Sequence, residues 1–288
     1  MDALGNKFAH GRQPALDVAR GLAVLCMMYE HFVPTESDNA LWQAAAASLA
    51  QLADGKSAPL FCMLLGIGFS LQVQRENDPG ILCAGLWRRA LALGVLGFIL
   101  GATLWPTEIL FPMGMMTVLL WPGRGRRAAI LFSLAILLMV PLVSANFAGY
   151  IRHDWLEDGS HLREKQFGWV TLRYFTIDGN FPLVPWLVFP LFGVIFATFD
   201  WTQGQWARRC FWLSLTAAVG FQLYAAWAKA HQEMLNRQLA STWVPTSIPF
   251  VFVGASSASA VICGMVWWQL AGVKQFRLFD VFGRLGLP

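Results

Sequence analysis

Long apolar runs separated by short polar stretches dominate the chain. Most of these runs approach the roughly 20 apolar residues that an α-helix needs to cross the hydrocarbon core of a bilayer. The pattern predicts eight helices, at residues 16–33, 57–73, 90–106, 109–121, 128–144, 181–199, 209–228 and 246–270. A further apolar helix is predicted to begin in the terminal sequence FDVFGRLGLP, residues 279–288. The expected fold class is therefore all-α, a polytopic integral membrane helical bundle with about eight transmembrane helices plus the start of a ninth.

Two stretches depart from this regular pattern. Three prolines, Pro182, Pro185 and Pro190, lie within 181–199. Each proline removes a backbone donor, so we expect a kinked or broken start that neighbouring helices or cavity water compensate. Residues 145–180 form the longest polar insertion, which is long enough to fold over a cavity.

Composition supports a membrane protein and excludes several other classes. The chain is 56% hydrophobic and 13% charged, about half the charged fraction of a typical soluble domain. We expect one integral membrane domain covering residues 1–288, surrounded by the lipid bilayer. The net charge of +4 does not indicate nucleic-acid binding, because the basic residues gather at helix ends as topology signals do. The five cysteines lack metal-ligand spacing and are expected to be small buried hydrophobes, so no metal site is predicted.

The distribution of charge predicts the orientation of the chain. One set of polar segments carries most of the basic residues: the leader and the loops at Arg75, Arg88, Arg124, Arg208 and Lys274. The opposite set is richer in acids and contains Glu36, Asp54, Glu108 and the 145–180 insertion. Because loops rich in lysine and arginine stay in the cytoplasm, the N-terminus is predicted to be cytoplasmic.

The first apolar helix carries the strongest candidates for a functional site. Asp17 either favours the helix N-terminus or has a supporting role in a functional site, and Arg20 either reaches the membrane interface or binds phosphate or carboxylate. His31 is either an interfacial histidine or a general base, because an imidazole accepts protons near neutral pH. Arg20 and His31 lie about 16 Å apart along the helix axis. Glu30 is expected to contact a loop or water, with a supporting role as the alternative.

Two further groups of polar residues are weaker candidates. Arg88 and Arg89 precede the predicted helix at 90–106, where they either set topology or contact an anionic ligand at the cytoplasmic side. His153, His161 and His231 lack metal-ligand spacing and are interpreted as loop residues, with contact to an acceptor substrate as the alternative. The chain contains no zinc-protease motif, phosphate-binding glycine loop or dinucleotide fingerprint, so soluble-type chemistry is not expected.

Several of these segments resemble one family of membrane enzymes. The R-x10-H spacing from Arg20 to His31, preceded by LDVA and followed by FCMLLGIGFSL and WRRAL, resembles the acyltransferase-3 family. The broader superfamily includes the heparan-alpha-glucosaminide N-acetyltransferase family. The segments LDVARGLAVL, GKSAPLFCMLLGIGFSLQVQR and FPLVPWLVFPLFGVIFA are similar to bacterial relatives of this superfamily. The resemblance implies a multi-pass protein of the bacterial inner membrane.

The resemblance also implies an activity. The family transfers an acyl group, commonly acetyl from acetyl-CoA, to a hydroxyl or amine of a carbohydrate-like or lipid-linked acceptor, with acyl-CoA as a substrate and no tightly bound cofactor. By this resemblance His31 is catalytic, and Arg20, Arg88 and Arg89 bind the donor. Asp17 and Glu30 are assigned supporting roles.

Two features depart from the family pattern. Heparan-type relatives place the catalytic histidine in the loop after the first helix, and residues 33–56 here contain no histidine. The R-x10-H alignment alone therefore assigns His31. Family members also continue through one or two helices after the G-R-L-G-L motif, so the resemblance implies further C-terminal helices that this sequence lacks.

Two other classes of function fit the same residues. A transporter or flippase would line its path with polar groups without chemistry. A non-catalytic subunit would keep the fold in association with other membrane proteins. Transfer from labelled acetyl-CoA separates the enzyme from both alternatives.

Overall fold

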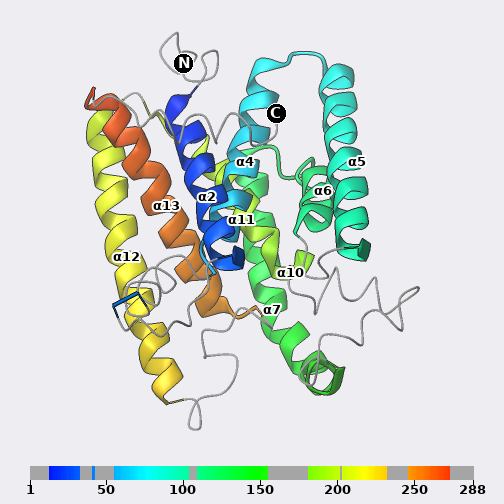
Figure 1. Ribbon diagram of the computed structural model, residues 1–288. Coiled ribbons are helices and arrows are strands. Elements are labelled where there is room, and N and C mark those ends of the chain that lie inside the picture. Colours follow the sequence, from blue (N-terminus) through cyan, green and yellow to red (C-terminus); the bar gives the residue numbers. More distant parts are fainter. Residues whose placement is uncertain are drawn as a thin grey trace. The chain divides into compact units, whose positions relative to one another are not determined.

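The described part of the chain consists of helices, without strands (Figure 1). The computed structural model describes residues 13–32, 41–42, 55–103, 109–154, 181–201, 203–231 and 246–272. Within these ranges the helices are α2 (Pro14–Phe32), α4 (Ser57–Arg75), α5 (Pro79–Thr103), α6 (Leu110–Leu119), α7 (Arg126–Asp154), α10 (Leu183–Trp186), α11 (Val188–Phe196), α12 (Gly204–Ala230) and α13 (Ile248–Leu270). The prediction of an all-α fold is confirmed for these residues.

Four of the helices are long and apolar enough to cross a bilayer. They span Ser57–Arg75, Pro79–Leu100, Gly204–Ala228 and Ile248–Leu270. These spans agree with a multi-pass membrane protein, and the larger count of about eight or nine stays a prediction. The expected ninth helix at 279–288 lies outside the described residues.

Helix α5 begins eleven residues earlier than the sequence pattern predicted. The carboxylate of Asp78 accepts a hydrogen bond from Gly80 N at 2.7 Å, and Pro79 occupies the first helical position. Both are strong helix-start signals, because aspartate satisfies an exposed N–H and proline has none to satisfy. The prediction that Arg88 and Arg89 precede this helix is therefore wrong, since both lie within it.

Two other predicted segments also change length. Helix α7 runs to Asp154, so the first ten residues of the expected polar insertion continue the helix. Residues 155–180 of that insertion lie outside the described ranges. Helix α6 has 10 residues and is about 15 Å long, which is shorter than a bilayer core. Its Gly114 lies against the backbone of Ala90 and Gly94 in α5, where a Cβ would come within 2.8 Å of the Ala90 carbonyl oxygen.

The proline-rich segment is broken, as predicted. Val184, near the start of α10, has non-helical backbone angles, and the segment forms two short helices, α10 and α11, with Leu187 between them. Trp186 lies at this break and is almost completely buried, with its Nε1 donating to Thr246 Oγ1 at 2.9 Å. The Phe181 and Phe189 rings pack edge-on against the same indole. The polar atom of the largest buried side chain is thereby satisfied.

The described helices belong to two compact units, and each is considered by itself. The first unit comprises Met1–Leu64, Phe199–Gly220 and Val253–Pro288, and therefore contains all of α2. The second comprises Leu65–Thr198 and Phe221–Phe252 and contains α5, α6, α7, α10 and α11. The expectation of a single domain stays a prediction.

Helices α4 and α11 meet in the second unit through a glycine. A Cβ built on Gly66 would lie 1.8 Å from the Pro190 carbonyl oxygen, so the two backbones are in direct contact there. We expect Gly66→Ala to lower the free energy of unfolding in detergent by about 1–3 kcal/mol, because the added methyl group forces the two backbones apart. Gly85→Ala in α5 is the matched control, since its Cβ would meet nothing within 4 Å. Equal thermal unfolding temperatures for the two variants would contradict this packing.

Candidate functional site

Helix α2 carries both Arg20 and His31 on one continuous element. It starts with Pro14 and runs for 19 residues to Phe32. Eleven helical steps of about 100° return to within about 20° of the starting direction, so positions 20 and 31 share one face. The backbone of His31 lies in the last turn of α2, and its side chain lies outside what the structure describes.

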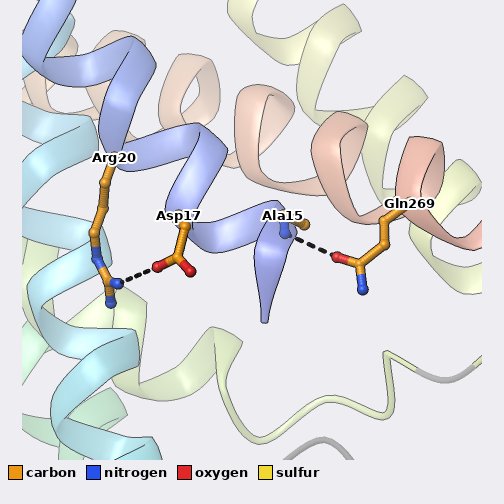
Figure 2. A network of polar contacts seen from close by, with 4 residues as sticks. All are labelled: Ala15, Asp17, Arg20 and Gln269. Atoms are coloured by element: carbon orange, nitrogen blue, oxygen red, sulfur yellow. Dashed lines mark hydrogen bonds and ion pairs between the residues drawn. The ribbon is translucent and has the colours of Figure 1, made fainter. Parts of the chain in front are cut away.

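Asp17 and Arg20 form an ion pair on successive turns of α2 (Figure 2). Arg20 Nη1 donates to Asp17 Oδ1 at 3.0 Å, and the two side chains are 27% and 11% exposed, respectively. The carboxylate lies in the first turn, where the helix dipole favours a negative charge. A largely buried carboxylate thus holds a partly exposed guanidinium against the start of the helix. The position of Asp17 agrees with a role at the helix terminus, and its supporting role in a functional site stays a prediction.

The first turn of α2 also contacts a helix that is distant in sequence. The side-chain oxygen Oε1 of Gln269, in the last turn of α13, accepts a hydrogen bond from Ala15 N at 2.8 Å (Figure 2). These residues are 254 positions apart, and sequence reasoning did not identify Gln269. The sequence signal for such a partner is the lack of a strong capping residue before Pro14, which leaves Ala15 N without a local side-chain acceptor.

Glu30 contacts the start of α4. Ser57 Oγ donates to Glu30 Oε2 at 2.7 Å, and Ser57 is the first residue of that helix. Helix α4 has no acidic residue in its own first turn, so Glu30 supplies a negative charge there from another helix. This contact is with a helix start, and the expected contact of Glu30 with a loop or water stays a prediction. The bond fixes the last turn of α2, one residue before His31.

Arg88 and Arg89 lie in the second compact unit, in the third turn of α5. Arg88 is exposed, and its Nε approaches the Ala84 carbonyl oxygen at 3.4 Å. Arg89 is half-buried. Neighbouring helical residues point about 100° apart, so the two guanidinium groups start from different faces of α5. Arg20 belongs to the first unit.

The cysteines follow the sequence interpretation only in part, because Cys26, Cys83 and Cys210 are half-buried. The interpretation of His153 as a loop residue is wrong, since its backbone continues helix α7. Cys62 and Cys263 are fully buried, and the thiols of Cys263 and Cys210 hydrogen-bond to each other between α13 and α12. His231 follows α12 directly and stacks on Trp227. Among the described residues, no three histidine, cysteine or acidic side chains come together as metal ligands.

Comparison with known proteins identifies a related family. The family model described as heparan-alpha-glucosaminide N-acetyltransferase, catalytic, matches residues 12–227, which is well over half of the chain. The matched segment includes α2 and α5 and ends before α13. Searches of curated proteins and of solved structures give no match.

The Glu30–Ser57 bond can be measured by a double-mutant cycle. We expect Glu30→Ala and Ser57→Ala to be coupled by about 0.5–1.5 kcal/mol in the free energy of unfolding, because each removes one partner of the same bond. Ser256→Ala is the matched control, since that serine donates to the Val253 carbonyl oxygen of its own helix. The effects of Glu30→Ala and Ser256→Ala on the free energy of unfolding should be additive. If those of Glu30→Ala and Ser57→Ala are additive too, the Glu30–Ser57 bond does not contribute to stability.

Proposed function

Because the chain belongs to the family of heparan-alpha-glucosaminide N-acetyltransferase catalytic domains, we propose that it transfers an acetyl group from acetyl-CoA to an acceptor at the membrane. The family match over residues 12–227 carries this proposal. The acceptor is a hydroxyl or amine of a carbohydrate-like or lipid-linked molecule. The enzyme works in a bacterial inner membrane with its N-terminus in the cytoplasm, as the distribution of basic residues indicates.

The proposed donor anchor is Arg20, with Arg88 and Arg89 as further cations for the phosphate groups of acetyl-CoA. A guanidinium group binds phosphate through two parallel hydrogen bonds, which an ammonium group cannot reproduce. The ion pair with Asp17 supports this role because it orients the guanidinium at the start of α2. Arg20 also remains 27% exposed, which leaves it accessible to a ligand.

His31 is the proposed general base. The acceptor oxygen or neutral amine attacks the thioester carbonyl carbon, and its proton passes to the imidazole. The carbon–sulfur bond then breaks, coenzyme A leaves with the electron pair, and the imidazolium returns a proton to the sulfur. Arg20 and His31 lie on one face of α2, about 16 Å apart along the axis. An extended thioester arm bridges such a distance between its phosphate end and its acyl carbon.

Loss of His31 tests the reaction. With labelled acetyl-CoA and a membrane extract as the source of acceptor, we expect purified wild-type protein to form labelled product. His31→Gln should reduce the rate about a hundredfold to ten-thousandfold with donor binding kept, because an amide cannot act as a base near neutral pH. His231→Gln is the control and should keep the wild-type rate. Donor binding without transfer by wild-type protein would favour a transporter or a non-catalytic subunit, and an active His31→Gln variant would remove His31 from the mechanism.

Replacement of Arg20 tests the donor anchor. Arg20→Lys keeps the charge but loses the planar fork, so we expect the Kd for acetyl-CoA to rise about tenfold. Arg124→Lys is the matched control, because Arg124 is exposed and lies over the Trp121 ring. Equilibrium binding to labelled acetyl-CoA measures both variants. Wild-type affinity in both Arg20→Lys and Arg20→Ala would remove Arg20 from donor binding.

A further inference from the structure

We propose that Gln269 in α13 is a positioning residue for the donor anchor on α2. This inference rests on the proposed function, and it extends the donor site beyond the segment that matches the family model. Gln269 acts on the donor through the first turn of α2 and the Asp17–Arg20 pair, without touching the donor itself. Figure 2 shows these contacts together.

The backbone donors in the first turn of α2 define the role of Gln269. The first four N–H groups of a helix have no acceptor within the helix itself. Pro14 has no N–H, and the Gln13 carbonyl oxygen accepts from Leu16 N and Asp17 N at 3.0 and 3.3 Å. The remaining donor is Ala15 N, which belongs to a buried residue, and its acceptor is Gln269 Oε1. Gln269 therefore completes the hydrogen bonding of this turn.

Gln269 substitutes for a capping residue that the sequence does not provide locally. Serine, threonine, aspartate and asparagine are the strong capping residues, and position 13 before the helix holds a glutamine. An unmade bond at a buried N–H costs about 1–3 kcal/mol, so the turn would unwind or shift without Gln269. Asp17 lies in that turn and holds Arg20 at 3.0 Å. Any displacement of the turn therefore reaches the guanidinium.

The last turn of α13 is itself held firmly. Trp267 packs against Phe211 of α12 with ring centroids 5.6 Å apart, and Gly264 lets the same phenylalanine approach closely. Gly272, at φ +73°, donates from its N–H to the Gln269 carbonyl oxygen at 3.1 Å and ends the helix. Gln269 thus reaches Ala15 from a packed and capped turn. The negative end of α13 also lies beside the positive end of α2, which favours this pairing.

The experiment compares four full-length variants for acetyl-CoA affinity, for KM and kcat, and for thermal stability. Gln269→Leu removes the acceptor at similar size, and we expect it to raise the Kd and KM for acetyl-CoA about three- to tenfold with kcat at saturating donor unchanged. Gln269→Leu combined with Gln13→Ser should return the affinity to within about twofold of wild type, because a serine at position 13 caps Ala15 N from its own chain end. Gln13→Ser alone should bind as wild type does. Gln222→Leu, at an exposed position of α12, is the matched control and should change nothing.

The outcomes separate this inference from the proposed function. Wild-type affinity in Gln269→Leu would overturn the inference alone. A parallel loss of kcat, affinity and thermal stability that Gln13→Ser does not restore would make Gln269 purely structural and would also overturn it. Absence of acetyl-CoA binding by wild-type protein would overturn the proposed function and this inference with it.

Discussion

The interior of a bilayer offers no water to backbone N–H and C=O groups, so every such group must find a partner within the protein. This constraint explains the less regular parts of the structure. Helix α2 begins with a buried N–H that donates to a glutamine distant in the sequence. The break at Val184 in α10 is tolerated because the residues around it, Leu183, Trp186 and Leu187, are buried within the protein. Polar contacts thus occur where regular helical hydrogen bonding stops.

The same constraint governs the charges of the first compact unit. A lone charge in an apolar helix is expensive, and its cost falls when an opposite charge or a hydrogen-bond donor lies beside it. Asp17 and Arg20 neutralise one another near the start of α2, and Glu30 near its end meets the Ser57 hydroxyl. The two ends of α2 are therefore each fixed by a polar contact. Arg20, the proposed donor anchor, is part of the first contact, and His31, the proposed base, directly follows Glu30 of the second.

Local signals in the sequence predicted much of the fold and less of the site. Apolar runs located α2, α4 and α13 to within about two residues, and prolines predicted the break before α11. The start of α5 was missed because the apolar run begins after it, although Asp78 and Pro79 are a readable capping signal. The partners of Ala15 and Glu30 could not be predicted, because they lie 254 and 27 residues away and depend on how helices pack. The roles of His31, Arg20, Arg88 and Arg89 stay predictions.

The bond between Ala15 and Gln269 has a consequence for the order in which the protein is made. Ribosomes add about 5–20 residues per second, so α13 emerges roughly 10–50 s after the first turn of α2. During that interval Ala15 N, at the start of α2, lacks the Gln269 side chain that accepts its hydrogen bond. A prematurely terminated polypeptide would carry the arginine of α2 but not the glutamine of α13 that accepts the hydrogen bond from Ala15 N. The hydrogen bond that completes the proposed donor anchor would therefore form only after α13 has been synthesised.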